Sequence, residues 1–293
     1  MRLVLGVLLA LVLLALAPRN ATSRKGKRTS ASSGPSGWRA PSSVTAQVLL
    51  QQAACDATID VVEASELSAE EFHNNYLGKS KPLLIRGATR AWRAHRQWRR
   101  KSFVESFGHL RAQTGNATDL VLFNGGWHVH ARPRDSLAAF IQSFGEDAGA
   151  TTAKTPLDKP FIFEANELLG ASPELRSQFS TPHALRPAFS TVDEGRDVKN
   201  GAAPMWSVFS LGEDEAGLPF HSHGAAWLAV VHGAKHWLLY PPGGFDARDR
   251  AATTPLSGVA HWFHHVRPNL VKQPIECTQR PGEVLFVPTA WLQ

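Results

Sequence analysis

The sequence predicts a mainly β domain preceded by a short helical region, and three observations support that prediction. The chain has 293 residues and is 43% hydrophobic, enough for one domain of about 200 to 250 residues with a sizeable core. A capping box, Ser68-Ala-Glu-Glu71, opens a helix early in the chain. The second half holds short apolar runs separated by Gly, Pro and polar residues, which is the pattern of strands joined by turns.

The N-terminus indicates export. Residues 3–17 form an unbroken apolar run, about the length of a signal-peptide core and short of the ~20 residues that span a bilayer. We therefore expect residues 1–17 to be a signal peptide. A retained signal anchor is the alternative, because Pro18 disfavours cleavage and basic residues follow the run.

Positive charge gathers before the expected domain. Residues 1–45 contain seven of the 31 Lys and Arg residues and no acid, which leaves 24 bases against 25 acids in the rest of the chain. Residues 18–45 are also rich in Ser, Gly and Pro, so we expect a basic disordered linker there. Because the remainder is nearly neutral, we expect no nucleic-acid partner.

Helices and short strands alternate in the first half of the expected domain. The helix that begins at Ser68 should end near Leu77, where Gly78 follows, and "KPLLIRGAT" predicts a strand. Trp- and Arg-rich segments predict helices to about Leu110. Further along, "LVLFNGGWHVHA" predicts a hairpin, "DSLAAFIQSFG" a helix and "PFIFE" a strand.

The second half predicts strands at "PMWSVFSLG", at "GEVLFVP" and on both sides of Gly233-Ala234 in "AAWLAVVHGAKHWLLYPP". Gly at the first position of a two-residue loop suits a type II′ turn, which predicts a hairpin. In that hairpin His232 lies opposite Lys235. One face then carries Leu228, Val230, His232, Lys235, Trp237 and Leu239.

Lys235 is the unexpected member of that face. A lysine among large apolar residues is costly unless an anion meets its ammonium group. The alternative is an edge position from which the amine reaches water along its aliphatic stem. The pattern alone favours neither.

His221 and His223 stand one residue apart in "FHSHGAAW", just before a predicted strand. Alternate residues of a strand point to the same face. The two side chains are therefore either a pair of metal ligands or two polar residues at the end of a strand.

Two further groups of histidines have simpler explanations. His261, His264 and His265 in "AHWFHHVRP" could form a three-histidine zinc site, but a local cluster of histidines in a loop is more often a surface feature. His128 and His130 in "WHVH" alternate like ligands, and half-buried hairpin residues would do the same.

Cys55 and Cys277 are the two cysteines of the chain. A disulfide between them would close a long loop and stabilise the fold by about 4 kcal/mol or more. Two unrelated buried thiols remain the alternative on spacing alone. Asn20-Ala-Thr22 and Asn116-Ala-Thr118 match the glycosylation sequon and fit a glycoprotein of the secretory pathway.

Taken together, "KPLLIRG", "LPFHSHG", "GAKHWLLYPP" and "RPGEVLFVP" resemble the JmjC domain. The resemblance runs from about Cys55 to Gln293 and includes both cysteines. It implies a double-stranded β-helix, the jelly-roll of the cupin superfamily, and residence in the endoplasmic reticulum lumen. The expected domain is residues 46–293, with a helical part over about 46–115 and the β-helix core over about 116–293.

The resemblance also implies an iron(II) and 2-oxoglutarate site. In active members an H-x-D/E pair and a distal histidine hold the iron, and a lysine pairs with the far carboxylate of 2-oxoglutarate. On this alignment His221 and His223 take metal positions, and Lys235 binds the cosubstrate.

Several departures from the family pattern put oxygenase chemistry in doubt. His223 stands where the family has a carboxylate, and Gln293 stands where the distal histidine would be. Leu218 and Leu228 replace residues that contact the cosubstrate in many active relatives. The last strand of the barrel would follow Gln293, so we expect it to be missing. The polar segment 188–203 and this abrupt end suggest an alternative transcript or an imperfect gene model.

The expected function is therefore that of a regulatory or interaction protein built on an oxygenase scaffold. Little or no oxygenase activity is expected, with low occupancy by iron(II) and 2-oxoglutarate. The alternative is an active 2-oxoglutarate-dependent dioxygenase that hydroxylates proteins. Either function requires a protein partner or a protein substrate. Contact with a membrane is expected only if the signal segment is retained.

Overall fold

The computed structural model describes residues 35–38, 44–51, 55–115, 134–144, 159, 161–165, 167–189, 207–218, 220–253 and 262–293. Within those ranges, no helix has both the length and the apolar character needed to cross a bilayer. Several residues of interest lie outside the described ranges: residues 1–17, Asn20, Asn116, His128, His130 and His261.

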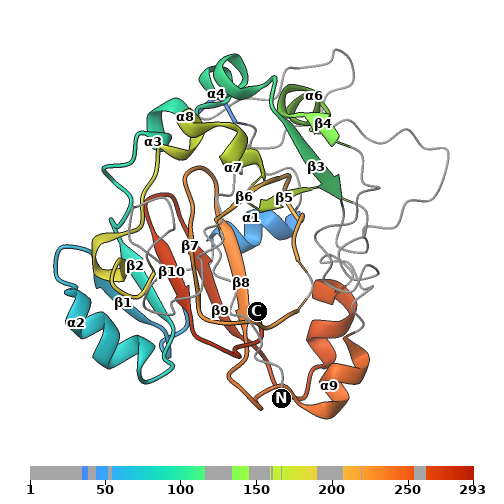
Figure 1. Ribbon diagram of the computed structural model, residues 1–293. Coiled ribbons are helices and arrows are strands. Elements are labelled where there is room, and N and C mark those ends of the chain that lie inside the picture. The colour runs from blue at the N-terminus through green and yellow to red at the C-terminus, as the bar shows by residue number, and fades with distance from the viewer. Residues whose placement is uncertain are drawn as a thin grey trace, which may run out of the picture.

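Two facing sheets form the centre of the molecule (Figure 1). One has the strand order β1-β2-β10-β7, and the other is the ribbon β8-β9. β10 is antiparallel to both β2 and β7, and β1 is parallel to β2. The bounds are β1 (Asp60–Glu63), β2 (Leu83–Arg86), β7 (Ala226–Ala229), β8 (Lys235–Leu239), β9 (Ile275–Gln279) and β10 (Val284–Val287).

A further sheet has the order β4-β3-β5-β6, with all neighbours antiparallel. Its strands are β3 (Arg111–Gly115), β4 (Arg134–Ser136), β5 (Phe161–Ala165) and β6 (Val208–Gly212). The strands predicted at "PFIFE" and "PMWSVFSLG" correspond to β5 and β6.

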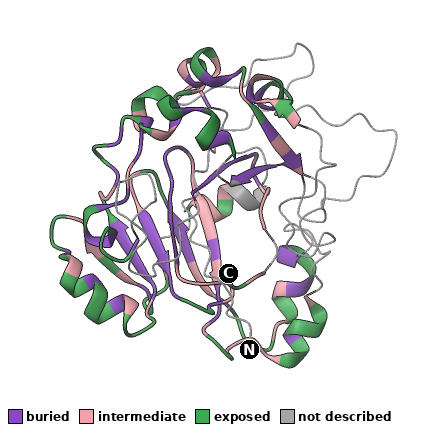
Figure 2. Ribbon diagram, in the orientation of Figure 1, coloured by how far each residue is buried: buried purple, intermediate pink, exposed green. Residues whose placement is uncertain are grey.

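Helices gather at one end of the sheets and along the edges (Figure 1). Their outer faces are exposed, whereas the central strands are mostly buried (Figure 2). The α-helices are α1 (Val44–Gln51), α2 (Ala69–Phe72), α3 (Ala94–Gln97), α4 (Arg100–Phe107), α6 (Leu137–Gln142), α7 (Glu167–Ala171), α8 (Pro173–Arg176) and α9 (Ala247–Ala252). The other helical turns are η1 (His73–Leu77), η3 (His183–Leu185), η6 (Trp262–Val266) and η7 (Arg267–Asn269).

The capping box at Ser68 is confirmed. The Ser68 hydroxyl accepts a hydrogen bond from the backbone N–H of Glu71, and the Glu71 carboxylate accepts from the Ser68 N–H. α2 begins at the next residue, and the helical turn continues through η1 to Gly78. The local signal was sufficient here because both partners of the cap lie within one turn.

Two apolar clusters divide along β7. Trp227 and Ala229 pack with the helices, whereas Leu228 and Val230 pack between the two central sheets. This is the alternation that a strand buried on both faces requires. Trp38 joins the helical cluster with 2% of its surface exposed. It lies within the stretch that we expected to be a disordered linker, and its indole N–H donates to the Trp98 carbonyl at 2.9 Å.

The hairpin predicted at Gly233-Ala234 is wrong. Gly233 has a positive φ of 83°, as the turn signal required, but β7 pairs with β10 and β8 pairs with β9. The turn is a corner at which the chain changes sheets, and a glycine at positive φ serves such a corner as well as a hairpin. His232 therefore does not lie opposite Lys235. Burial, together with the charges of His95 and Arg99, lowers the pKa of His232 to about 4.

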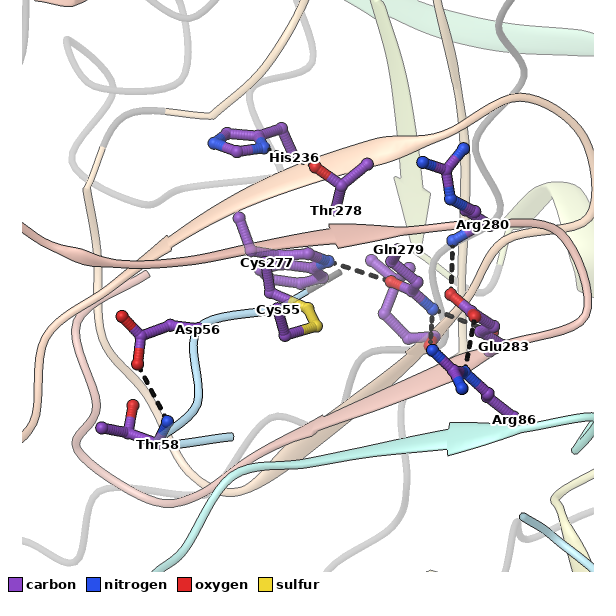
Figure 3. The surroundings of a disulfide bond; sticks show 12 residues. Cys55, Asp56, Thr58, Arg86, His236, Cys277, Thr278, Gln279, Arg280 and Glu283 are labelled. Atoms are coloured by element: carbon purple, nitrogen blue, oxygen red, sulfur yellow. Dashed lines mark hydrogen bonds and ion pairs between the residues drawn. A yellow bond between two sulfur atoms is a disulfide. The ribbon is translucent and has the colours of Figure 1, made fainter. Parts of the chain in front are cut away.

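A Cys55–Cys277 disulfide joins the segment before β1 to the middle of β9, which confirms the predicted bridge (Figure 3). Next to it, the Asp56 N–H donates to the Glu276 carbonyl at 2.8 Å. Carbonyls of α1 also contact this strand and the residue after it: Thr278 Oγ1 lies 3.3 Å from the Leu49 carbonyl, and Arg280 Nη2 lies 3.0 Å from that of Leu50. α1 and residues 55–56 thus cover the outer edge of β9, which would otherwise be exposed.

Candidate functional site

Three chain segments meet at one end of the β8-β9 ribbon. His221 and Gln293 exchange both backbone hydrogen bonds, at 3.0 and 2.9 Å, and Ala290 N–H donates to the His223 carbonyl at 2.9 Å. Tyr240, directly after β8, exchanges backbone bonds with Leu292 at 2.9 and 3.0 Å. The C-terminal segment therefore lies between the histidine pair and the end of β8, in the manner of neighbouring antiparallel strands.

His223 is held in the tautomer that a metal ligand needs. Its Nδ1 lies 2.7 Å from the Gly224 carbonyl, and because a carbonyl only accepts, Nδ1 carries the proton and Nε2 carries the lone pair. Burial lowers the pKa of His223, and the charge of Lys235 lowers it further, although the bond to Gly224 acts in the opposite direction. The neutral imidazole is therefore favoured at neutral pH. The His221 ring lies 5.3 Å from the His223 ring, centroid to centroid.

Gln293 places its side chain against that lone pair. The two Nε2 atoms, of Gln293 and His223, are 2.6 Å apart, so the amide donates to the imidazole. The amide oxygen, Gln293 Oε1, is buried and has no hydrogen-bond partner among the described residues, which costs about 1 to 3 kcal/mol. The amide nitrogen, and not this oxygen, therefore faces His223.

These residues fit a metal ion in part. Two imidazoles suit zinc, copper or iron, but an amide oxygen is a neutral third donor, and the set contributes no negative charge. Within the part of the chain that the structure describes, no group of three or more His, Cys, Asp or Glu side chains could hold a metal. The predicted metal ligands are therefore brought together, while the carboxylate of an iron facial triad is not among them.

Lys235 is close enough for its charge to act on His223. It begins β8 and is half-buried, and its ammonium lies 3.7 Å from the centre of the Trp237 ring. Burial lowers its pKa to about 7. Lys235 makes no ion pair among the described residues. Its ammonium group instead contacts the face of the Trp237 ring in a cation–π interaction. A dicarboxylate would supply the missing counter-charge.

Trp237 is fixed from the other side by Gln279, a residue that the sequence did not single out. The Trp237 indole N–H donates to Gln279 Oε1 at 2.9 Å, and Gln279 Nε2 donates to the carbonyls of Leu228 and Glu283 at 2.8 and 2.9 Å. Gln279 is completely buried and lies directly opposite Lys235 in the β8-β9 register. No sequence signal marked it, because its role depends on which strand pairs with β8.

Among the described residues, the other candidate histidines do not join His221 and His223 in a group of three metal ligands. His264 and His265 are exposed in η6, whose Trp262, Phe263 and Val266 form a small apolar cluster against which Phe220, the residue before His221, packs. Leu218 and Leu228 pack in the cluster between the two central sheets and add no polar group to it.

Paired facing sheets with an imidazole pair at one end define the class of the protein as a double-stranded β-helix of the cupin type. Residues 68–292 match the family model described as a cupin-like domain. The chain therefore belongs to the cupin-like family, in its JmjC branch.

Several curated relatives carry JMJ or JmjC names. The chain is 25% identical over 248 residues to lysine-specific demethylase JMJ21 of Arabidopsis thaliana, which covers 79% of this chain and 23% of that protein. It is 24% identical over 267 residues to JmjC domain-containing protein 8 of Rattus norvegicus, covering 88% and 84% of the two chains. It is 26% identical over 251 residues to the 2-oxoglutarate and iron-dependent oxygenase JMJD4 of Homo sapiens, covering 79% and 56%. The chain thus spans about a quarter of the first of these and just over half of the third.

Proposed function

We propose that this protein is a regulatory or interaction protein of the endoplasmic reticulum lumen that uses a JmjC scaffold and has little or no oxygenase activity. The observation that carries the proposal is the donor set. His221, His223 and Gln293 offer two imidazoles and one amide, so iron(II) would bind without an anionic protein ligand and with low occupancy.

The lumenal location is supported by the Cys55–Cys277 disulfide, because such bridges persist in oxidising compartments. Glycosylation at Asn20 or Asn116 is the independent test. A glycosidase-sensitive mobility shift of the protein from secretory-pathway membranes supports this location, and its absence at both sites counts against it.

An active protein hydroxylase is the second candidate, and Lys235 is the observation in its favour. A half-buried ammonium with no ion pair among the described residues provides the counter-charge for the far carboxylate of 2-oxoglutarate. One relative is named a 2-oxoglutarate and iron-dependent oxygenase. In both candidates the partner or substrate is a protein.

The deciding experiment compares the natural chain with a His223→Asp/Gln293→His variant. Both are loaded anaerobically with iron(II), and succinate formation from 2-oxoglutarate is measured after oxygen is admitted. We expect weak metal uptake and negligible succinate for the natural chain, and at least tenfold tighter iron binding for the variant, because an anionic ligand and a third imidazole are restored. Steady succinate production by the natural chain would overturn the proposal in favour of the hydroxylase.

Lys235→Ala tests the cosubstrate position directly. We expect 2-oxoglutarate affinity, measured by calorimetry, to fall by a factor of 50 or more, since the charge that meets the far carboxylate is removed. Lys272→Ala is the matched control, because its side chain is exposed. Equal losses in both variants would show that Lys235 is not the anchor.

A further inference from the structure

We propose that the Cys55–Cys277 disulfide controls how tightly Lys235 binds a dicarboxylate, so that reduction of the bridge weakens ligand binding at this site. The inference rests on the proposed function, because it concerns regulation of the same lysine. Four structural steps connect the bridge to the ammonium group.

The first step is the position of Cys277 in its strand. Cys277 lies directly opposite Trp237 in the antiparallel β8-β9 register, and opposite residues present their side chains on the same face. Both are buried, with 1% and 6% of their surfaces exposed, in the same apolar cluster. The bridge is therefore attached at the level of the indole that lies beneath Lys235.

The second step leads from Trp237 to the amine. The Lys235 ammonium lies 3.7 Å from the centre of the Trp237 ring, so a displacement of the ring displaces the preferred position of the charge. The ring is oriented by Gln279, which follows Cys277 by two residues on the same face of β9 (Figure 3). β9 thus supplies both the side chain against which the Trp237 ring packs and the hydrogen bond that orients the ring.

The third step is the weak support of β9. Within the described residues, β8 is its only strand partner, and an isolated two-stranded ribbon is marginally stable. Its outer edge is covered by α1 and by residues 55–56 through single hydrogen bonds, including Asp56 N–H to the Glu276 carbonyl at 2.8 Å and, directly after β9, Arg280 Nη2 to the Leu50 carbonyl at 3.0 Å. The Cys55–Cys277 disulfide links residues 55–56 covalently to β9.

The fourth step is access to the bridge. Cys55 is half-buried, whereas Cys277 is 1% exposed, so Cys55 is the more accessible of the two cysteines to an attacking thiolate. A dithiol reductant is the co-reactant. Its first thiolate bonds to Cys55 Sγ and breaks the disulfide, and Cys277 leaves as a thiolate that takes up a proton. Its second thiol then displaces Cys55, so the two electrons come from the dithiol, which becomes a disulfide.

The test measures binding of N-oxalylglycine, a dicarboxylate analogue of 2-oxoglutarate, by anaerobic calorimetry. The oxidised protein is compared with the dithiothreitol-reduced protein and with a Cys55→Ser/Cys277→Ser variant. We expect at least fivefold weaker binding in both forms that lack the bridge. Near-ultraviolet circular dichroism identifies a temperature at which every form is folded, and the single Cys55→Ser variant replaces the double one if the latter does not fold.

Lys235→Ala in both redox forms separates a specific route from general loosening. We expect the redox effect to shrink to less than twofold in this background, because the bridge acts through the lysine. A redox effect that persists undiminished without Lys235, or equal affinities of the oxidised and reduced natural chain, overturns the inference and leaves the Lys235 site intact. Failure of the ligand to bind either form overturns both this inference and the anion site.

Discussion

The two faces of the β8-β9 ribbon use polar side chains in opposite ways. On the outer face, His236 lies 2.9 Å from Thr278 Oγ1 and 3.1 Å from a Glu276 carboxylate oxygen, and Glu276 also accepts from Arg267 Nε at 3.0 Å. These polar side chains are paired with one another. On the inner face, Lys235 has an aromatic ring where a carboxylate would be expected.

This difference separates structural from functional polarity. A closed group such as the outer one satisfies its members and needs no ligand. On the inner face, Gln279 satisfies both the oxygen and the nitrogen of its amide. The Lys235 ammonium, in contrast, has no anionic partner among the described residues. A half-buried cation of this kind costs folding free energy unless a ligand brings the opposite charge. The inner face is therefore where binding is expected.

The largest expected effect comes from Gln279→Leu. The change removes the described acceptor of the Trp237 indole N–H and one donor each from the carbonyls of Leu228 and Glu283, and we expect a loss of about 3 to 5 kcal/mol in the free energy of unfolding. Urea denaturation measures it. Gln273→Leu is the matched control, because that side chain is exposed and makes one described bond. A loss below about 1 kcal/mol would show that the inner face does not depend on this amide.

Lys235→Met should have the next largest effect and the opposite sign. Because burial lowers the pKa of Lys235 to about 7, the unfolded chain holds this proton at pH values where the folded chain releases it. Removing the charge should stabilise the protein by about 3 kcal/mol at pH 7.

The difference in unfolding free energy between Lys235→Met and the natural chain should shrink as the pH rises from 7 toward 10. In this range the unfolded natural chain still binds the Lys235 proton and the folded chain has released it, so the natural chain becomes more stable with rising pH. Unfolding free energies measured across this range test the trend, with Lys272→Met as the control. A difference that does not change with pH would contradict the burial of a charged amine.

Thr278→Val on the outer face should have the smallest effect. It removes one hydroxyl that contacts His236 and the Leu49 carbonyl, so we expect a loss of about 1 kcal/mol. Affinity for a dicarboxylate should change by less than twofold, because the substitution lies on the face away from Lys235. A larger loss of affinity would mean that the two faces are coupled.

Local patterns predicted the elements well where both partners of an interaction are close in sequence. The Ser68 capping box and the strands β2 and β10 follow from a few adjacent residues. The placement of Gln293 against His223 followed from the family resemblance, since 70 residues separate the two. Whether they bind a metal stays a prediction.

Pairing between distant strands was the part that the sequence did not determine. The turn at Gly233 has the expected conformation, but a local turn signal does not reveal whether the second strand pairs with the first or crosses to another sheet. Gln279 was missed for the same reason. Trp38 was missed because its burial depends on the Trp98 carbonyl and the Phe103 ring, which lie 60 or more residues away.

The cysteines of the bridge are 222 residues apart, and this spacing affects the order of events during synthesis. At 5 to 20 residues per second, roughly 10 to 45 seconds pass between the synthesis of Cys55 and that of Cys277. During this interval the first thiol has no native partner and is available to other thiols. The nascent protein therefore depends on its surroundings to keep Cys55 unpaired, or correctable, until β9 has been made.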